Sequence, residues 1–414
     1  MNDISPAEVP YWQLFENTAR SVLAAYGYQE MRPPVVERTE LFSRSVGEGT
    51  DIVEKEMYTF EDRSGDSLTL RPECTAGCVR AAVEHGWLRG GGVRIWHMGP
   101  MFRYERPQKG RYRQFHQLDV EALGFPGSDV DAELILLSAR LWNRLSLENI
   151  RLEINSLGSR EAQAAYRQTL VDYFSAHRSA LDEDSLRRLG RNPLRILDSK
   201  NPEMQALIAD APAPVDHLDP SSAEHFEELK LILSESGIDF KVNKRLVRGL
   251  DYYTGTVFEW LTDQLGAQNA VCGGGRYDGL VAEIGGPETP ATGFALGIER
   301  LVELLKVQQI SPEETAPHAY LVAVGDRAGL LALPLAERVR DESFGLRLIV
   351  DAGKGSFKAK LKRADRSEAR FALILGDDEA GDGTVGVKDL RSNDPQTTIP
   401  QSEIGGFFQK QLLN

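Results

Sequence analysis

The sequence predicts an α+β protein in two parts, because two stretches of the chain carry different patterns of strands and helices. Within the first 310 residues, three strand segments follow one another without a helix between them, which predicts an antiparallel sheet. After residue 318, strands and helices alternate, which predicts an α/β sheet, largely parallel, of about a hundred residues. Two prolines and two acids at 311–318 predict a linker between the parts.

The composition restricts the class of protein. The chain has 414 residues, of which 41% are hydrophobic and 27% charged. A chain of this length is expected to contain two or three domains at about 150 residues each. The mixture is typical of globular proteins and excludes the disordered and fibrous classes. No stretch approaches the roughly 18 consecutive apolar residues that span a bilayer, so the sequence predicts no membrane segment.

The N-terminus and the cysteines indicate a cytoplasmic location, and the net charge restricts how a polynucleotide could bind. Residues 1–8 carry neither the basic nor the apolar segment of a signal peptide. The cysteines Cys74, Cys78 and Cys272 are too few for a disulfide framework and fit a reducing cytosol. No second Cys/His pair follows at zinc spacing, so we expect two buried thiols at Cys74 and Cys78 and no metal held by a side-chain cluster. The net charge of −14 means that any polynucleotide must bind through local basic patches.

The first part of the chain is predicted to begin with a helix and to continue into sheet strands. An amphipathic helix covers Pro10–Tyr26, and the residues that follow Gly27 as far as Pro34 are extended. The sequence Asp62-Arg63-Ser64-Gly65-Asp66 predicts a hairpin turn. The stretch 160–236 is polar and contains several prolines, which predicts a helical insertion. The other predicted elements are a helix at Glu73–His85 and strands at Met57–Phe60, Leu68–Leu70, Val93–His97, Met101–Glu105, Phe115–Glu121, Val257–Leu261, Asn269–Cys272 and Gly293–Leu296.

In the second part, strands are predicted to alternate with helices. Its predicted strands are Ala319–Val324, Arg347–Val350, Phe371–Leu375 and Thr384–Lys388, and its predicted helices are Arg327–Glu342, Phe357–Ala364 and Ser402–Leu413. One of these helices lies in a stretch with seven basic residues: Lys354, Lys358, Lys360, Lys362, Arg363, Arg366 and Arg370. Such a helix is either a surface that contacts phosphates or simply a solvated helix face.

The most informative segment is the basic stretch 103–113, which lies between two predicted strands. It contains four Arg and one Lys against one Glu, and Pro107 and Gly110 predict a loop. Guanidinium groups bind phosphoryl oxygens through paired hydrogen bonds, so the loop is a candidate phosphate site, with a solvated charged turn as the alternative. Phe115 on the following strand favours the phosphate site, because an aromatic ring beside arginine adds a stacking face.

Three further segments combine glycines with charged or aromatic residues. Arg248–Tyr253 forms a turn that either carries functional side chains or packs its two tyrosines on the core. Cys272–Gly279 has three consecutive glycines at a predicted strand end, which allow close approach to a ligand or a tight turn. In Gly293–Arg300 a strand runs directly into a helix, so that Arg300 lies either on the surface or in a pocket.

Together these segments resemble the histidyl-tRNA synthetases, a family of class II aminoacyl-tRNA synthetases, almost from end to end. Phe102–Phe115 resembles motif 2 of that class, Gly293–Arg300 resembles motif 3, and Pro34 stands where motif 1 builds a dimer interface. Arg248–Tyr253 and Gly273–Gly279 resemble two segments particular to the histidine family. The resemblance also covers Leu41–Gly47, Thr50–Phe60 and Leu70–Glu73.

The resemblance implies the architecture and the reaction. The implied fold is a class II antiparallel-sheet catalytic domain with a helical insertion, plus a C-terminal α/β anticodon-binding domain. The implied domains are the two parts of the catalytic domain at 1–159 and 219–311, the insertion at 160–218 and the anticodon-binding domain at 318–414. The implied reaction activates L-histidine with ATP and Mg²⁺ to histidyl-adenylate and transfers the histidyl group to the 3′ end of tRNA(His). The implied assembly is a homodimer.

The resemblance also assigns residues to each substrate. The implied catalytic residues, which contact the α-phosphate, are Arg103 and Arg248. The implied ATP-binding residues are Arg103, Glu105, Arg111, Tyr112, Phe115 and Arg300, with Phe115 stacked on adenine. The implied histidine-binding residues are Glu73, Thr75, Arg103, Gln117, Glu121, Arg248, Tyr252, Tyr253 and Tyr277. The implied tRNA-binding residues are Gln108, Lys109, Arg113, Lys358 and Lys362.

Within the implied histidine pocket, Glu121 and Tyr253 contact the two ring nitrogens. Neutral imidazole has one donor and one acceptor nitrogen, to which a carboxylate and a phenol are complementary. A site of this kind rejects analogues that lack the matching group by roughly 10⁴ or more, so no editing domain is expected. Alone, Glu121 is a strand-end carboxylate that pairs with an arginine, but its register with Gln117 places both on one strand face. His116 is expected to point to the opposite face.

Two departures and two alternatives accompany the resemblance. The family usually has an Arg-Gly pair before the stretch with which this chain begins, and glycine where Cys74 stands. One alternative is the synthetase-like, histidine-sensing regulatory subunit of ATP phosphoribosyltransferase, which lacks the C-terminal domain and the catalytic residues. The other is a class II synthetase of different specificity, which the segments Arg248–Tyr253 and Gly273–Gly279 disfavour.

Overall fold

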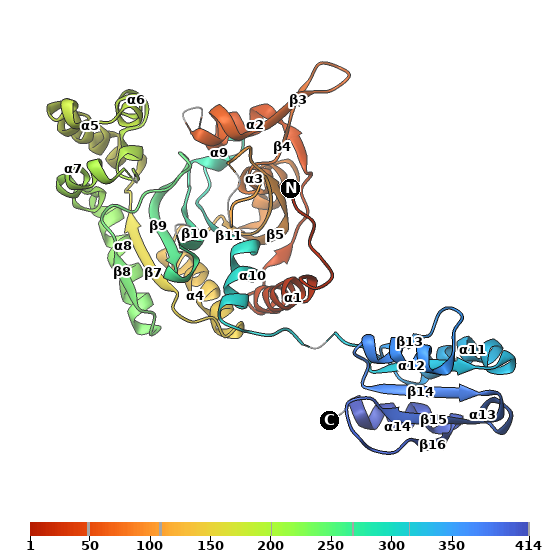
Figure 1. Cartoon of the computed structure of the whole chain (residues 1–414). Helices are drawn as coiled ribbons and strands as arrows, with labels where there is room; N and C mark the ends of the chain where they lie inside the picture. Colours follow the sequence, from red (N-terminus) through yellow and green to blue (C-terminus); the bar gives the residue numbers. More distant parts are fainter. Residues whose placement is uncertain (48–49, 107–109, 200, 267–268, 314, 413–414) are drawn as a thin grey trace. The chain divides into compact units, whose positions relative to one another are not determined.

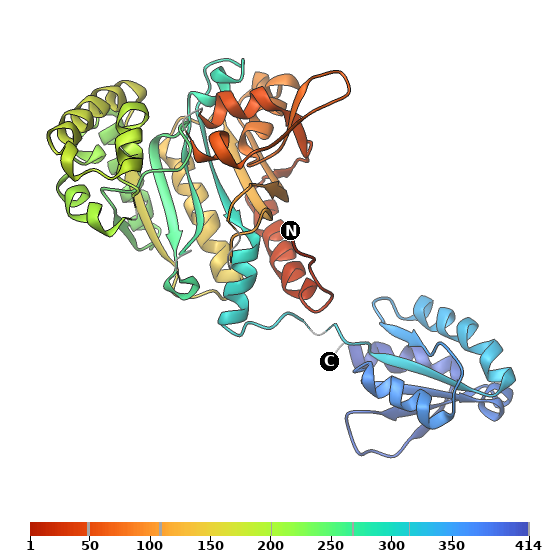
Figure 2. The same cartoon turned by 45° about the horizontal axis from the view of Figure 1, so that its top comes forward.

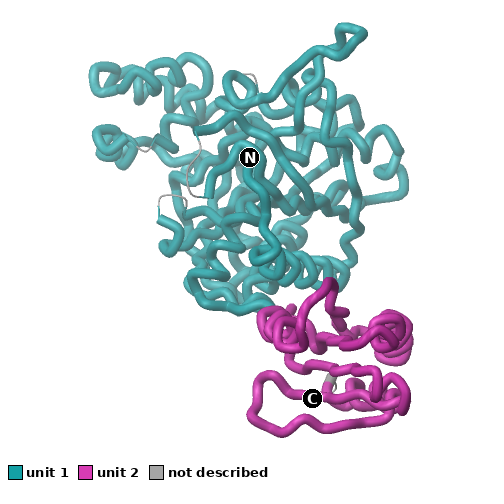
Figure 3. Tube along the Cα trace, turned by 45° about the vertical axis from the view of Figure 1, so that its right-hand side comes forward, with its two compact units in different colours: residues 1–312 teal, residues 313–414 magenta. Residues whose placement is uncertain are grey.

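The protein is built from two compact units, residues 1–312 and 313–414, each with its own sheet and hydrophobic core (Figure 3). The computed structural model describes residues 1–47, 50–106, 110–199, 201–266, 269–313 and 315–412. Across these residues, no helix combines the length and the apolar character needed to traverse a bilayer.

An eight-stranded sheet forms the centre of the first unit (Figure 1). Its strand order is β1-β5-β6-β11-β10-β9-β7-β8. All neighbours from β5 to β7 pair antiparallel, whereas the edge strands β1 and β8 pair parallel, which confirms the predicted antiparallel sheet. The strands are β1 (Gln29–Glu30), β5 (Val93–Phe102), β6 (Gln114–Leu123), β7 (Arg151–Ser156), β8 (Phe240–Val242), β9 (Thr254–Leu261), β10 (Ala270–Arg276) and β11 (Ala291–Gly297).

Three helices cover one face of this sheet: α1 (Val9–Ala25), α4 (Ser128–Arg144) and α10 (Ile298–Val307) (Figure 2). Trp12 of α1 and Leu301 of α10 pack in one core with sheet residues. On β6, Leu118 belongs to this core, whereas Phe115 packs in a second core on the other face. This alternation follows from the two-residue period of a strand, and it leaves one face of β6 free for polar side chains.

The strand β5 corrects one prediction. We expected separate strands at Val93–His97 and Met101–Glu105, but β5 runs without interruption from Val93 to Phe102. Pro100 is tolerated because β1 pairs only with Ile95 and Trp96, so the missing N–H group of Pro100 lies on an unpaired edge. The sequence could not show where the neighbouring strand stops.

The triple glycine corrects a second prediction. We expected Gly273–Gly275 at a strand end, but these residues lie inside β10 and pair on both sides, with β9 and β11. A Cβ atom on Gly273 would lie 2.5 Å from Nη1 of Arg248, and one on Gly274 would lie 2.2 Å from the carbonyl oxygen of Gly293. The glycines therefore make room for a side chain and for a neighbouring strand, not for a turn.

A small three-stranded sheet with order β2-β4-β3 carries the predicted hairpin. Its strands are β2 (Val36–Arg38), β3 (Tyr58–Glu61) and β4 (Ser67–Leu70). The helices near it are α2 (Thr39–Val46), the single π-helical turn η1 (Ile52–Glu56), α3 (Thr75–Glu84) and α9 (Leu280–Glu283). Phe42 of α2 and Ala76 of α3 share a core, which anchors the start of α3 beside the large sheet.

Helices dominate the stretch between β7 and β8, as predicted for residues 160–236. They are α5 (Arg160–Ala176), α6 (Glu183–Arg191), α7 (Gln205–Asp210) and α8 (Pro220–Glu235). Ser159, Asp182 and Asp219 cap the N-termini of α5, α6 and α8 by accepting a backbone N–H bond. The last helix, α8, packs against α4.

The second unit has a five-stranded sheet with order β13-β12-β14-β15-β16. The strands are β12 (Ala319–Val324), β13 (Leu348–Val350), β14 (Phe371–Gly376), β15 (Thr384–Asp389) and β16 (Thr397–Pro400), and the helices are α11 (Asp326–Glu342), α12 (Phe357–Arg366), α13 (Asp377–Asp382) and α14 (Ile404–Leu412). We predicted a largely parallel sheet, which is wrong: β12 pairs parallel with β13 and β14, but the pairs β14–β15 and β15–β16 are antiparallel. The short β16 and α13 were not predicted.

Candidate active site

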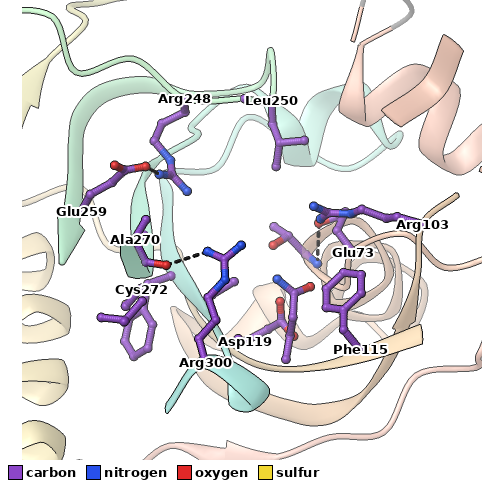
Figure 4. A pocket seen from close by; sticks show the side chains of 18 of the residues that line it. Glu73, Arg103, Phe115, Asp119, Arg248, Leu250, Glu259, Ala270, Cys272 and Arg300 are labelled. Carbon is purple, nitrogen blue, oxygen red and sulfur yellow. Dashed lines mark hydrogen bonds and ion pairs between the residues drawn. The ribbon is translucent and has the colours of Figure 1, made fainter. Parts of the chain in front are cut away.

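A cavity of about 280 Å³ opens on the polar face of the large sheet, opposite α1, α4 and α10. Strands β6, β9, β10 and β11, the start of α3 and the segment before β9 supply its walls. Thirteen residues predicted from the sequence line it: Glu73, Thr75, Arg103, Glu105, Arg111, Tyr112, Phe115, Gln117, Arg248, Tyr252, Tyr253, Tyr277 and Arg300. Figure 4 shows that arginines from distant parts of the chain surround one space.

Arg103 lies directly after β5, on the side of the cavity that also holds Glu73 and Phe115 (Figure 4). Its Nε donates a hydrogen bond to the carbonyl oxygen of Pro72 (2.8 Å), and its guanidinium carbon lies 5.2 Å from the centre of the Phe115 ring. These contacts fix the side chain between the start of α3 and β6. Arg103 is thus oriented by neutral groups that leave its charge available for an anion.

Arg248 occupies the opposite side of the cavity. It forms an ion pair with Glu259 of β9, and its guanidinium lies 5.5 Å from the ring centre of Tyr253. Burial opposes the charge of Arg248, but Glu259 and Tyr253 outweigh burial, and the pKa of Arg248 is raised above its usual value. The side chain crosses β10 at Gly273, where any Cβ atom would collide with it.

Two further arginines, Arg300 and Arg111, lie at the end of the cavity that is lined by Gly110 and Ala270. Arg300 of α10 donates to the carbonyl oxygens of Ala270 (2.6 Å) and Gly110 (3.3 Å). Burial, followed by repulsion from Arg111, lowers the pKa of Arg300. Arg111 pairs with Glu105 and has a side chain that is 44% exposed. Positive charge therefore gathers at this end, where an anion relieves the repulsion.

The carboxylate of Glu73 is held by the start of α3. The backbone N–H groups of Thr75 and Ala76 donate to its two oxygens at 2.9 and 3.0 Å. Burial raises the pKa of Glu73, and the bond from Ala76 and the charge of Arg103 only partly oppose this. Each oxygen keeps a second lone pair and Glu73 lines the cavity, so Glu73 can accept a bond from a cationic ligand.

Glu121 does not line the cavity itself, although it lies on the same face of β6 as Phe115. Its Oε1 accepts a bond from Thr75 Oγ1 (2.7 Å), and its Oε2 accepts one from the hydroxyl of Tyr277. Burial raises the pKa of Glu121 well above its usual value despite these bonds. Gly293 stands opposite Glu121 on β11, and a Cβ atom there would overlap Oε2 at 1.8 Å.

Three tyrosines form an aromatic wall next to Glu121. The rings of Tyr252 and Tyr253 lie 4.7 Å apart, and Tyr277 lies 5.5 Å from Tyr252. All three line the cavity and are buried. Burial raises the pKa of each, so their hydroxyl groups stay neutral and act as hydrogen-bond donors and acceptors.

His116 lies on the face of β6 that points away from the cavity, as predicted. Its Nδ1 lies 2.9 Å from Glu299, and its ring makes an edge contact with Trp12 in the helical core, with centroids 5.0 Å apart. The two thiols of Cys74 and Cys78 are buried as predicted, with sulfur atoms 3.9 Å apart.

Of the predicted tRNA-binding residues in the first unit, Arg113 is described and is not part of the cavity lining. The guanidinium of Arg113 lies 4.1 Å from the ring centre of Tyr104, and Lys358 and Lys362 are exposed on α12 in the second unit. Gln108 and Lys109 fall outside the described residues.

Sequence reasoning missed three charged residues of the cavity, Asp119, Glu259 and Glu299. Asp119 lines the cavity on β6, halfway between Gln117 and Glu121. The two-residue period that grouped Gln117 with Glu121 also points to Asp119, and this signal was available in the sequence. Glu259 became recognisable only through its ion pair with Arg248, which depends on the bend between the turn and β9.

Comparisons with known proteins agree over the full length of the chain. Residues 1–301 match a family model described as histidyl-tRNA synthetase, and residues 318–411 match one described as an anticodon binding domain. A curated histidine--tRNA ligase from Alkalilimnicola ehrlichii is 56% identical over 409 residues, which cover 99% of this chain and 95% of that protein.

Solved structures give the same result. The apo histidyl-tRNA synthetase of S. aureus is 33% identical, with a TM-score of 0.83 over 99% of this chain and 98% of that one. The histidyl-tRNA synthetase of Nostoc sp. PCC 7120 is 20% identical, with a TM-score of 0.71 over 100% of this chain and 98% of that one. An ATP phosphoribosyltransferase regulatory subunit/histidyl-tRNA synthetase from Bacillus halodurans is 21% identical, with a TM-score of 0.64 over 91% of this chain and 97% of that one. At such identities the last two demonstrate a shared fold only.

The antiparallel sheet with its arginine-lined cavity, joined to a unit that matches anticodon-binding domains, defines a class II aminoacyl-tRNA synthetase. The family model and the 56% identity narrow this class further. The chain belongs to the histidyl-tRNA synthetase family.

Proposed function

We propose that the protein activates L-histidine with ATP and transfers the histidyl group to the 3′ end of tRNA(His). The observation that carries this proposal is the convergence of Arg103, Arg248 and Arg300 on one cavity that also holds a buried carboxylate, Glu73. Such a cavity accepts a triphosphate at one end and a zwitterionic amino acid at the other.

In the first step, a carboxylate oxygen of histidine forms a bond to the α-phosphorus, and the bond from that phosphorus to the pyrophosphate oxygen breaks. Both reacting groups are anionic, so the protein must offset their repulsion. Arg103 and Arg248 approach from opposite sides and take the α-phosphate between them, where they stabilise the charge of the transition state. The acceleration then comes from positioning and electrostatics, without a covalent intermediate on a protein side chain.

The residues at the end of the cavity that holds Arg111 and Arg300 make the remaining contacts with the nucleotide. Phe115 stacks on one face of adenine and Arg300 lies over the opposite face. Glu105 and Tyr112 line the same part of the cavity. Arg111 and Arg300 hold the β- and γ-phosphates, whose charge relieves the repulsion between these two arginines.

Mg²⁺ would be bound mainly by the nucleotide. No group of three or more His, Cys, Asp or Glu residues suited to a metal occurs among the described residues. Each cavity carboxylate outside the histidine end already has a partner: Glu105 forms an ion pair with Arg111, Glu259 pairs with Arg248, and Glu299 accepts a hydrogen bond from the backbone N–H of His116. Mg²⁺ is usually held by one or two carboxylates plus substrate phosphates, which fits such a site, and it supplies further neutralisation of phosphate charge.

The histidine side chain occupies the tyrosine-lined end. Glu73 and Thr75 receive the α-amino group, with Gln117 nearby, and Glu121 and Tyr253 address the two ring nitrogens. Tyr252 and Tyr277 line the ring pocket, and the bonds from Thr75 and Tyr277 hold the Glu121 carboxylate in one orientation. The oxygens of Glu121 keep second lone pairs, which are the acceptors this role needs.

The larger assembly is part of the same proposal. We assign catalysis to residues 1–159 and 219–311, a helical insertion to 160–218 and anticodon binding to 318–414. Arg113, Gln108 and Lys109 contact the acceptor end of tRNA(His), and Lys358 and Lys362 contact its anticodon region. The protein acts as a homodimer in the cytoplasm, with Pro34 near the dimer interface.

A charging assay tests the proposal and separates it from a regulatory role. The purified chain is incubated with ATP, Mg²⁺, labelled histidine and a tRNA(His) transcript, with a second tRNA of different anticodon and acceptor sequence as the control. Histidyl-tRNA must form on tRNA(His) only. A chain that binds histidine but forms no histidyl-tRNA would instead support a histidine-sensing subunit.

A further inference from the structure

Asp119 is a buried carboxylate with an oxygen that no hydrogen bond satisfies among the described residues. It lies on β6 between Gln117 and Glu121, lines the cavity and is 1% exposed. Among the described residues, its Oδ2 has no hydrogen-bond partner. Burial of an unpartnered carboxylate is costly, so proteins rarely keep one unless a ligand supplies the partner.

The groups around Asp119 are of mixed charge. Glu73 raises the pKa of Asp119 further than burial does alone, while Arg71 and Arg103 oppose the shift. Arg71 already donates to the carbonyl oxygens of Pro33 (3.0 Å) and Pro100 (2.9 Å). It is therefore committed to backbone groups and is not a dedicated partner of Asp119.

His97 stands opposite Asp119 on β5 and does not compensate the charge. Its Nδ1 lies 3.0 Å from the carbonyl oxygen of Met31, which makes Nδ1 the donor and leaves Nε2 as an acceptor. Burial lowers the pKa of His97 to about 4, so the ring is neutral at pH 7. A neutral ring with an acceptor on its free side cannot stabilise a neighbouring carboxylate.

Three acceptors that line the cavity therefore receive no hydrogen bond from a cation among the described residues, although the charge of Arg103 acts on both carboxylates. They are the carboxylates of Glu73 and Asp119 and the side-chain oxygen of Gln117, which is buried and also lacks a partner among the described residues. An ammonium group has three N–H donors, and hydrogen bonds from a cation to carboxylates are about twice as strong as neutral ones. Thr75 donates its hydroxyl proton to Glu121, so its oxygen remains available as a further, neutral acceptor.

We propose that Asp119 accepts a hydrogen bond from the α-ammonium group of the amino-acid substrate and completes, with Glu73 and Gln117, a three-acceptor site for it. The inference rests on the proposed function, because it takes the substrate to be histidine. A contact of Asp119 with the imidazole is disfavoured, since Glu121 and Tyr253 already match both ring nitrogens. Asp119 is thus a determinant of recognition for the amino group, not for the ring.

The test compares two ligands that differ only in that amino group. Dissociation constants of L-histidine and of 3-(imidazol-4-yl)propionate are measured by calorimetric titration for the wild type and for Asp119→Asn. The isosteric change removes the charge and keeps the volume. The ratio of the two constants, histidine over analogue, is expected to rise about 10- to 100-fold, the effect of one charge-assisted hydrogen bond.

Glu121→Gln is the matched control, because Glu121 lies on the same strand face and is equally buried. It is expected to weaken both ligands to the same degree, which leaves the ratio unchanged. Melting temperatures of the ligand-free proteins distinguish a structural role of Asp119 from a role in ligand binding. Loss of a buried, unpartnered charge should leave the melting temperature of Asp119→Asn equal to or above that of the wild type. Asp119→Gly, which removes every acceptor atom, must give the same rise in ratio if Asp119→Asn does not fold.

The outcomes separate the two proposals. An unchanged ratio in a wild-type-like protein that binds histidine overturns the role of Asp119 alone, as does an equal loss of both ligands together with a lower melting temperature. A wild type that binds no histidine overturns the proposed function, and the inference fails with it.

Discussion

The sheets of the two units carry different side chains on their faces. One sheet has a polar face, which suits a small-molecule site, whereas the other has two apolar faces, which leaves only its outer surface for a macromolecule. In the first unit, β6 buries Leu118 on one face and presents Gln117, Asp119 and Glu121 on the other. In the second unit, β12 buries apolar residues on both faces, with Leu321 in one core and Val322 in another.

The charged groups follow the same division. Among the described residues, Oδ2 of Asp119 and Oε1 of Gln117 are buried polar atoms without hydrogen-bond partners, and both residues line the cavity of the first unit. Around Asp351 in the second unit the charges are satisfied, because Arg363 and Lys360 pair with its carboxylate. A cavity with buried polar atoms that lack hydrogen-bond partners suits a small, charged substrate, which can supply those partners. Exposed basic side chains over a closed apolar core suit a polyanion. Each experiment below acts on one side of this contrast.

The largest effect is expected from Arg248→Ala in the first unit. Histidine-dependent ATP–pyrophosphate exchange should fall about 10²- to 10³-fold, because one of the groups that stabilise the transition-state charge is lost. Arg370→Ala is the control, since Arg370 belongs to the second unit and its side chain is 57% exposed. Full exchange activity in folded Arg248→Ala would refute the role of this arginine.

Removal of residues 313–414 tests the independence of the units. The first unit has its own cores, so exchange should remain near the full-length value. Charging of tRNA(His) should fall about 100-fold, because the phosphate contacts of the second unit are lost. Charging that is unaffected by the truncation would remove anticodon binding from this unit.

Glu121→Gln tests which substrate the interior acidic face serves. The KM for histidine should rise about 10- to 100-fold, the effect of one hydrogen bond to a charged group, while the KM for ATP stays within about twofold. Steady-state exchange kinetics with each substrate varied in turn measure both. Equal losses for histidine and ATP would place Glu121 outside the ring pocket.

A smaller effect is expected from the exposed basic helix. The double variant Lys358→Ala/Lys362→Ala should weaken tRNA binding a few-fold and reduce the slope of log affinity against log salt concentration by about 2. Filter binding across a salt series gives the slope, and exchange activity serves as the internal control. A slope equal to that of the wild type would show that α12 is only a solvated face.

The smallest effect is a pH dependence of stability. Burial, followed by the charge of Glu73, raises the pKa of Asp119 in the folded protein, with Arg71 and Arg103 opposing. Stabilisation from a raised carboxyl pKa is present below the unfolded value and is lost as pH rises through the folded value. The melting temperature of Asp119→Asn minus that of the wild type should therefore be smallest near about pH 4 and grow as pH rises. A difference that shrinks with rising pH would contradict this sign.

The sequence predicted the elements whose patterns are local. Strand β12 agrees with its predicted bounds, because its apolar run is bounded by polar or turn residues. The continuity of β5 through Pro100 was not predictable, since it depends on where β1 ends. The parallel or antiparallel direction of β15 and β16 likewise depends on partners distant in the sequence.

The candidate site divides in the same way. The sequence singled out the arginines, because a basic segment and glycine-flanked turns mark them. That they surround one cavity could be seen only in the three-dimensional structure. Glu121 was expected as a direct contact, but its bonds to Thr75 and Tyr277 became visible only in three dimensions. Asp119 was accessible from the strand period, but its lack of a partner was not.

The most direct measurement of the central claim is ATP–pyrophosphate exchange with each of the twenty amino acids supplied separately. The arrangement of arginines beside a tyrosine- and carboxylate-lined pocket predicts exchange with histidine alone, and none above background with the other nineteen. Exchange driven by a different amino acid, or none with histidine, would contradict the account.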